Sequence, residues 1–563
     1  MDKSCPWNEY PRPQLKRNSF FCLNGEWDFA ITKEGTPPRK YTEKILVPFP
    51  PESRLSGIER KIAKDDRLYY RRSFTLPDGF KKDRVLLRFG AVDRLSKLEI
   101  NGKLAGVHND GYLPFYADIT ELLVDGENEI VLSVTDDLSK IYPYGKQKAK
   151  RGGMWYTPVS GIWQTVWIES VPTQYIKNIR LEPTATEVKI TVDCESKKKK
   201  ITLTDSGEVY EFEGDSIVIQ PLNPRPWSPE EPNLYRFKLE TDCDAIESYF
   251  ALREVGIVYQ NGVARLALNG KPYLFNGLLD QGYFPDGIFL PATKEGYEED
   301  IKLAKSLGFN TLRKHIKLEP AIFYYLCDLN GICVFQDMIN NGRYSFLRDT
   351  VLPTLGFKHR SDHFLHNNEK SRKAFLDCMT GTVNTLYNYP SVVYYTIFNE
   401  GWGQFNADVV YRKLTSLDNS RIVDATSGWF WQNKSQVDSY HVYFKELNVN
   451  SDTPRPVVIS EFGGYSHRVK GHLFGSKNYG YKKFASREEF ERAVVDLYEN
   501  QALPLVKECV SALIYTQISD VEDETNGFAT YDRRCIKIKP ETMRAIAEKM
   551  KITIANNDTS EEI

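Results

Sequence analysis

The stretch VVYYTIFNEGW at residues 392–402 decides the fold. Its first part, Val392–Phe398, is an unbroken apolar and β-branched run, which is typical of a strand covered on both faces. Asn399 and Glu400 follow without a turn, and Gly401 comes next. A carboxylate directly after a buried strand is costly unless it is solvated, paired or used in chemistry. The stretch therefore predicts a parallel-sheet strand that ends at a polar site.

Further strands and helices alternate around this stretch after residue 257. The patterns predict helices at Glu298–Leu307, Pro320–Leu329 and Phe375–Tyr387, and strands at Asn310–Arg313, Cys333–Gln336, Pro456–Ser460 and Ala512–Tyr515. Such alternation indicates a parallel sheet, and the length of 257–563 suits a closed (β/α)₈ TIM barrel. A doubly wound sheet is the alternative, but no Gly-rich phosphate turn follows an early strand.

The chain before residue 257 carries only short strand patterns. Between residues 1 and 172 they include Val85–Phe89, the hairpin turn Asn101-Gly102 and Glu129–Val134, which together predict a jelly-roll β-sandwich. Residues 173–256 carry further strands over a length that fits one immunoglobulin-like β-sandwich. The basic run Lys197–Lys200 is interpreted as a solvated hairpin tip.

Composition excludes several classes of function. The 74 Lys and Arg nearly balance the 76 Asp and Glu, so no overall field favours nucleic acid or an anionic membrane. No segment approaches the ~20 apolar residues that cross a bilayer, and the first residues show no secretory signal pattern. The nine cysteines are scattered and odd in number, which predicts buried free thiols and a cytoplasmic location.

A second strand also ends in a carboxylate. The run Val457–Ser460 leads into Glu461, with Gly463 close behind. In a barrel, residues at the carboxyl ends of strands face the substrate, so Glu400 and Glu461 are expected at one rim. Cleavage of a glycosidic bond needs two opposed carboxylates. From spacing alone, structural ion pairs with nearby Arg and Lys are an equal alternative.

Seven segments resemble glycoside hydrolase family 2, the β-galactosidases, β-glucuronidases and β-mannosidases, over nearly the whole chain. They are LNGEWDF (23–29), YRRSF (70–74), YTPVSGIWQ (156–164), FALRE (250–254), LGFNTLR (307–313), IFNE (397–400) and SEFG (460–463). The resemblance implies a retaining exo-β-glycosidase built from a jelly roll, an immunoglobulin-like sandwich and a TIM barrel. It also implies that Glu400 is the general acid/base and Glu461 the nucleophile.

Electrostatics agree with these two roles. A retaining mechanism needs carboxyl groups ~5–5.5 Å apart. We expect Glu461 to be ionised and held by Arg313 and a tyrosine hydroxyl. We expect Glu400 to start protonated, and to act as a base once glycosylation removes the charge of Glu461.

Other polar and aromatic residues are predicted around the substrate. The resemblance implies that Asn399 binds the 2-hydroxyl of the sugar. Arg313 is expected to pair with the nucleophile, with a structural ion pair as the alternative. His441, Trp402 and Trp429 are candidates whose alternative role is core packing, and Tyr465 follows the nucleophile closely enough to reach it. The remaining candidates follow barrel strands or lie late in the barrel: Asp280, Gln281, Asp337, Asp523 and Asn526.

The choice of sugar depends on a departure from the family. Its β-glucuronidases carry an Asn-x-Lys element that grips the uronate, whereas the matching stretch here, DETNGFAT (523–530), has no lysine. Acidic residues would repel a uronate, so a neutral sugar is predicted, with galactose first. The alternatives within the family are arabinose, galactofuranose or mannose, and a β-glucuronidase. Gln517 stands where many relatives have tryptophan.

No cofactor or metal site is predicted, because no His/Asp/Glu cluster has convincing ligand spacing. The expected partner is an oligosaccharide or glycoside, and the resemblance allows a homo-oligomer without specifying one. A catalytically inactive carbohydrate-binding protein is the alternative from another class. Retention of both Glu400 and Glu461 argues against it.

Overall fold

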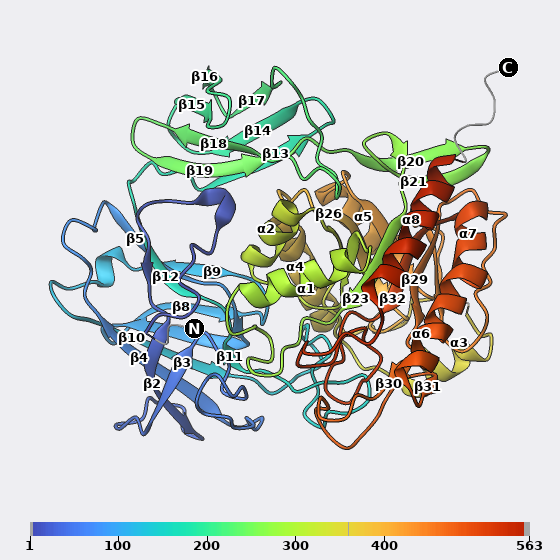
Figure 1. Cartoon of the computed structure of the whole chain (residues 1–563). Coiled ribbons are helices and arrows are strands. Elements are labelled where there is room, and N and C mark those ends of the chain that lie inside the picture. Colours follow the sequence, from blue (N-terminus) through green and yellow to red (C-terminus); the bar gives the residue numbers. More distant parts are fainter. Residues whose placement is uncertain (1–3, 359, 557–563) are drawn as a thin grey trace.

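The computed structural model describes residues 4–358 and 360–556 and comprises two β-sandwiches and a barrel (Figure 1). The first sandwich lies beside the barrel, and the second lies above both in this view. The predicted architecture of a jelly roll, an immunoglobulin-like sandwich and a TIM barrel is confirmed.

The jelly roll consists of two facing antiparallel sheets. Alternation along β10 (Asn128–Thr135) buries every second side chain between them. One sheet has the order β1 (Phe21–Cys22), β12 (Val166–Val171), β5 (Arg84–Phe89) and β9 (Phe115–Asp118). The other has the order β3 (Glu43–Val47), β2 (Gly25–Thr32), β4 (Arg67–Phe74), β10, β7 (Leu95–Ile100) and β8 (Lys103–Asn109).

The second sandwich pairs a three-stranded with a four-stranded sheet. The three-stranded sheet has the order β13 (Asn178–Pro183), β14 (Val188–Asp193) and β17 (Ser216–Ile219). The four-stranded sheet has the order β16 (Val209–Glu213), β15 (Lys198–Leu203), β18 (Tyr235–Glu240) and β19 (Ala245–Phe250). The prediction of a solvated tip at Lys197–Lys200 is wrong for Lys199. Its ammonium group is buried and donates to the carbonyls of Ser196 and Gly214 at 2.6 and 2.8 Å, which satisfies the charge inside the sandwich.

A small antiparallel sheet precedes the barrel. It consists of β20 (Val255–Gln260), β21 (Val263–Leu268) and β22 (Lys271–Pro272), so the expected boundary after residue 256 falls within β20. Arg265 of β21 donates to the carbonyl of Val510 at 2.9 Å, where the last barrel strand begins. The sheet therefore covers the end of the barrel opposite the carboxyl ends of the strands.

Eight parallel strands form a nearly closed barrel. Their order is β27 (Ile422–Ser427), β26 (Val392–Asn399), β25 (Cys333–Asp337), β24 (Thr311–Lys314), β23 (Phe275–Asp280), β32 (Val510–Thr516), β29 (Val457–Gly463) and β28 (Asp438–Val442). The two end strands, β27 and β28, lie side by side without a hydrogen-bonded ladder in the described part of the chain. All carboxyl ends therefore meet at one rim.

Helices surround the barrel close to the predicted positions. They are α1 (Glu295–Ser306), α2 (Ala321–Asn330), α3 (Leu352–Thr354), α4 (Glu369–Leu386), α5 (Ala407–Leu417), α6 (Arg487–Asp496), α7 (Leu503–Glu508) and α8 (Pro540–Asn556). Helix α2 ends at Gly331, whose φ of +65° and close approach to Pro229 leave no room for a side chain. Among the described helices, none is both long and apolar enough to cross a bilayer.

The expectation that the cysteines are buried holds only in part. Cys327, Cys333, Cys378 and Cys509 are buried, whereas Cys243 is exposed.

Candidate active site

The barrel rim brings the two glutamates together. Glu400 directly follows β26, and Glu461 lies on β29 in register with His441 of β28. One carboxylate oxygen of Glu400, one of Glu461 and one ring nitrogen of His441 all lie within 4.8 Å of one another. Because the carboxyl groups of a retaining pair lie ~5–5.5 Å apart, this spacing suits a single anomeric carbon between the two glutamates.

Glu461 is buried and held by two donors. Nη1 of Arg313 donates to its Oε1 at 3.1 Å, and the hydroxyl of Tyr443 donates to its Oε2. Burial works to raise the pKa of this carboxyl, but attraction to His441 and Arg313 outweighs it and lowers the pKa to about 2. Glu461 is therefore ionised at neutral pH, as a nucleophile must be.

The position of Glu400 is fixed through its backbone. Its φ is +54°, a conformation that costs ~1–3 kcal/mol in a residue other than glycine. Two hydrogen bonds hold it there: its amide donates to the carbonyl of Ser427 at 3.0 Å, and the indole of Trp429 donates to its carbonyl at 3.1 Å. The side chain is 15% exposed, more open than that of Glu461 at 6%.

His441 lies between the two carboxylates. Its Nδ1 is 2.8 Å from Oε1 of Glu400, and its Nε2 is 3.0 Å from the hydroxyl of Ser427 and 3.7 Å from Oε1 of Glu461. Gly428 makes room for the ring, because a Cβ there would come within 2.7 Å of the imidazole. The imidazole is thus placed to orient Glu400 relative to Glu461.

These three side chains also have the spacing of a cation site among the described residues. Zn²⁺ binds imidazole and carboxylate ligands of this kind. However, Arg313 and Tyr443 already use both carboxylate oxygens of Glu461, and a cation would occupy the place of the anomeric carbon. The donor set fits two reacting carboxylates better than a resident metal.

Arg313 connects several of the predicted site residues. The guanidinium is buried, and its Nε donates to both carboxylate oxygens of Asp337 at 3.0 Å. Nη2 donates to Oδ1 of Asn399 at 2.9 Å, and Nη1 contacts Glu461. Since Oδ1 of Asn399 is used in this way, its amide NH₂ group is left to donate to a sugar hydroxyl.

His315 joins the same network and was not singled out from the sequence. Its Nδ1 lies 2.6 Å from Oδ2 of Asp337. Burial, followed by repulsion from Lys146, lowers the pKa of His315 to about 4. The imidazole is therefore neutral at pH 7 and offers one donor and one acceptor.

Both carboxylate oxygens of Asp280 accept hydrogen bonds, one of them within a network of ion pairs. Its Oδ2 accepts from Nζ of Lys314 at 2.6 Å, and its Oδ1 accepts from the amide of Gly282 at 2.8 Å. Lys314 also donates to Glu319 at 2.9 Å. The neighbouring Gln281 is buried, and its Oε1 has no hydrogen-bond partner among the described residues.

The two predicted tryptophans differ in their surroundings. Trp402 is 2% exposed, and its ring packs edge-on against Trp155 at 5.1 Å and Tyr144 at 5.4 Å. Trp429 contacts the ring of His441 at 5.5 Å, besides its bond to Glu400. Trp429 thus lies beside Glu400 and His441, whereas Trp402 is surrounded by other aromatic rings.

Two tyrosines follow the strands that carry His441 and Glu461. Sequence proximity favoured Tyr465 as the residue that reaches Glu461, but the hydroxyl at Glu461 belongs to Tyr443. The hydroxyl of Tyr465 instead accepts from Nζ of Lys482 at 3.5 Å. The reason is strand alternation: Tyr443 lies two residues after His441 and shares its direction.

The late acidic stretch contacts the jelly roll. Asn526 accepts from Nε2 of Gln517 at 2.8 Å, and Gln517 also donates to Glu524 at 3.0 Å. The hydroxyl of Tyr156, from the jelly roll, donates to Glu524 at 2.5 Å, and burial raises the pKa of Glu524 to about 7. Asp523 pairs with Arg151 of the jelly roll at 3.4 Å.

Four residues near the site were missed, although each had some signal in the sequence. Tyr443 and His315 each lie two residues beyond a predicted site residue, and Glu524 belongs to the quoted acidic stretch. Tyr156 lies in a quoted family segment of another domain, and no local pattern indicates that it crosses to the barrel.

Comparisons with known proteins agree on the family of all three parts. The model described as "Glycosyl hydrolases family 2, TIM barrel domain" matches residues 262–535. The model described as "Glycosyl hydrolases family 2, sugar binding domain" matches residues 58–172, and the one described as "Glycosyl hydrolases family 2" matches residues 174–253. A putative beta-glucuronidase of Formosa agariphila is 23% identical over 455 residues, which is 71% of this chain and 50% of that protein. A beta-galactosidase of Thermoanaerobacter pseudethanolicus is 26% identical over 296 residues, or 48% of this chain and 39% of that protein. The chain thus spans at most about half the length of these relatives.

A solved structure shares the fold over nearly the whole chain. The beta-D-glucuronidase of Dictyoglomus thermophilum superposes with a TM-score of 0.74 at 19% identity, covering 96% of this chain and 98% of that one. At this identity, the likeness shows the fold alone.

Proposed function

Because the chain belongs to glycoside hydrolase family 2, we propose that it removes terminal sugars from β-glycosides with retention of configuration. One observation carries the proposal: a carboxylate oxygen of Glu400 and a carboxylate oxygen of Glu461 lie within 4.8 Å of each other. In this proposal Glu461 attacks the anomeric carbon while Glu400 protonates the leaving oxygen.

The surroundings of each carboxylate support its role. The lowered pKa of Glu461 keeps it ionised for attack, and Arg313 holds it in place. Formation of the glycosyl–enzyme bond neutralises Glu461, so Glu400 can then take a proton from water without facing a second negative charge. His441, in contact with Glu400 at 2.8 Å, positions this acid/base.

We propose a neutral sugar as the substrate, with a β-galactoside first. Glu524, Gln517 and Asn526 form a buried polar cluster, in which Oε1 of Gln517 and Nδ2 of Asn526 have no partner among the described residues and are the groups proposed to bind sugar hydroxyls. Glu522 and Asp523, beside Glu524, add negative charge that Arg151 only partly offsets. A substrate carboxylate would meet repulsion there.

A β-uronide is the second candidate, because one lysine near His315 and Glu524 lacks a carboxylate partner among the described residues. Lys146 belongs to the jelly-roll segment around Gly145, which packs against the barrel near Ile316. Its charge acts on both His315 and Glu524, and among the described residues no carboxylate pairs with it. Lys146 could therefore face the carboxylate of a uronide.

A panel of nitrophenyl β-galactoside, glucuronide, mannoside and arabinoside tests both candidates. The first proposal expects the galactoside to turn over fastest, with no effect on that rate in Lys146→Met. If the glucuronide is preferred and Lys146→Met abolishes only that activity, the second candidate replaces the first. The matched control is Lys150→Met, an exposed lysine on the same loop. Sugar binding without any turnover would instead identify a carbohydrate-binding protein.

A further inference from the structure

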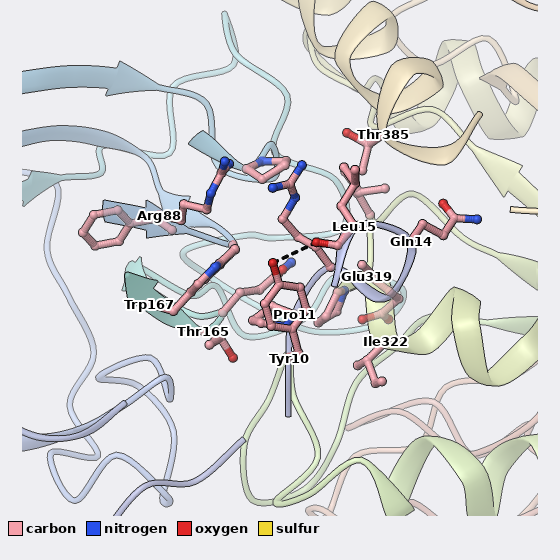
Figure 2. Close-up of a pocket in the computed structure, with 18 of the residues that line it drawn as sticks. Tyr10, Pro11, Gln14, Leu15, Arg88, Thr165, Trp167, Glu319, Ile322 and Thr385 are labelled. Atoms are coloured by element: carbon pink, nitrogen blue, oxygen red, sulfur yellow. Dashed lines mark hydrogen bonds between the residues drawn. The ribbon is translucent and has the colours of Figure 1, made fainter. Parts of the chain in front are cut away.

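A cavity of about 270 Å³ lies between the jelly roll and the barrel helices (Figure 2), and neither Glu400 nor Glu461 lines it. Arg88 and Trp167 project into it from jelly-roll strands β5 and β12, and Ile322 and Thr385 from helices α2 and α4. The N-terminal segment around Tyr10 forms a further wall. Its volume is near the lower end of the ~300–1,000 Å³ of small-molecule pockets.

Arg12 and Arg88 line this cavity and belong to an ion-pair cluster that holds a surplus of one positive charge. Buried Glu169 is surrounded by Arg88 at 2.9 Å, Arg12 at 3.4 Å and Arg17 at 3.8 Å. The only other carboxylate that pairs with these arginines in the described chain is Asp244, at 2.8 Å from Arg17. Three guanidinium groups thus face two carboxylates.

The remaining charged groups that line the cavity do not remove this surplus. Glu9 is 3.5 Å from Nζ of Lys294. Glu319 accepts from Lys314 and Lys317, each at 2.9 Å. These carboxylates are already neutralised by their own lysines.

Two side chains that line the cavity have polar groups without a protein partner among the described residues. Arg88 is 8% exposed, and in the described chain its hydrogen bond comes from Nε to Glu169, which leaves both Nη groups without a partner. Gln164 is 7% exposed, and its side-chain amide also lacks a partner among the described residues. These groups are therefore available to hydrogen-bond with a ligand in the cavity.

Aromatic rings form the apolar part of the wall. The ring of Trp167 is buried, and its indole nitrogen donates to Glu169 at 2.9 Å. The ring of Tyr116 lies 4.8 Å from the guanidinium carbon of Arg88 and is 53% exposed, so the cavity reaches the surface there. Flat aromatic faces of this kind pack against the C–H groups of a small polyhydroxylated ligand.

We propose that this cavity binds a sugar acid, a small hydroxylated carboxylate. The two free Nη groups of Arg88 match a planar carboxylate in a bidentate pair. One negative charge cancels the surplus, whereas a phosphate dianion would exceed it. Hydroxyl groups of the ligand satisfy Gln164. The site is separate from the catalytic rim and does not depend on the proposed hydrolase activity.

Calorimetric titration of the whole protein tests this site with D-glucuronate and D-gluconate as probes. D-Glucitol, which lacks only the carboxylate of gluconate, is the neutral control. We expect at least one of the two acids to bind at one site per chain, no binding of glucitol, and an affinity at least tenfold weaker in Arg88→Met. The matched control is Arg84→Met, an exposed arginine on the same strand, which should bind as wild type does.

Binding at the catalytic rim is distinguished by turnover of a nitrophenyl glycoside. A sugar acid in the interdomain cavity should leave the Michaelis constant unchanged, whereas purely competitive inhibition with an unchanged affinity in Arg88→Met would overturn the proposal. The absence of binding by both acids at ~10 mM would overturn it as well. If Arg88→Met does not fold, Tyr116→Ala, at an exposed position, should weaken binding in its place.

Discussion

Replacement of Tyr443 by phenylalanine should slow the enzyme without disturbing its fold. The change removes the hydroxyl that donates to Oε2 of Glu461 and keeps the ring, which stacks on Tyr481 at 4.0 Å. A hydrogen bond to a charged group contributes ~1.5–3 kcal/mol. Arg313 still neutralises Glu461, so kcat/KM should fall about 10- to 100-fold, at 1.36 kcal/mol per tenfold.

The matched variant is Tyr465→Phe, which removes the hydroxyl that sequence proximity favoured. That hydroxyl accepts from Lys482 and does not contact Glu461, so kcat/KM should change less than about threefold. The assay is kcat/KM across pH on the best nitrophenyl glycoside. Only Tyr443→Phe should move the acidic limb upward, because its hydroxyl helps to lower the pKa of Glu461. A larger loss in Tyr465→Phe than in Tyr443→Phe would refute the reasoning.

Three further outcomes are expected. Glu400→Ala should cost ~10²–10⁴-fold in rate with an alkyl leaving group and much less with dinitrophenol, while the exposed control Glu446→Ala stays near wild type. In the folded protein the pKa of Glu524 is raised from 4.5 to about 7. Between these two pH values the folded state keeps a proton that the unfolded chain has lost, so the free energy of unfolding of the wild type falls as pH rises from 4.5 through about 7. As pH rises from 4.5 to 8, the free energy of unfolding of Glu524→Gln should therefore increase relative to that of the wild type by on the order of 3 kcal/mol. Thermal unfolding at several pH values measures this difference. EDTA should leave turnover unchanged, whereas Zn²⁺ should inhibit competitively by binding Glu400, His441 and Glu461; loss of activity in EDTA would contradict this.

The barrel was predictable because its strands are apolar throughout and its helices end at recognisable residues. The run Val392–Phe398 lies within β26, and the helix predicted before Gly331 ends there. The burial of Lys199 was not predictable, since a lysine in a basic run gives no local sign that the backbone carbonyl of Gly214, fifteen residues away, will accept its hydrogen bond.

Within the site, residues at strand ends and the pairing of Arg313 with Glu461 could be inferred, but most other partners could not. Strand-end position indicated Glu400, Glu461 and Arg313, since carboxyl ends of parallel strands share a rim. The ion pair that occupies Asp280 depends on Lys314 of the adjacent strand, and strand pairing is not written in either segment alone.

Contacts between domains were the least accessible from the sequence. Tyr156 reaches Glu524 across 368 positions, and Arg151 pairs with Asp523 in the same way. Such contacts depend on how the jelly roll docks on the barrel, which no local periodicity encodes. The interdomain cavity beside Arg88 is hidden for the same reason.

The most direct test of the central claim is to trap the sugar on the enzyme. A 2-deoxy-2-fluoro glycoside of the best substrate, with a good leaving group, should inactivate the protein with one label per chain. Peptide mapping by mass spectrometry should locate that label on Glu461, and Glu461→Gln should take none. A label on Glu400, or a product of inverted configuration by NMR, would contradict the assignment of the two glutamates.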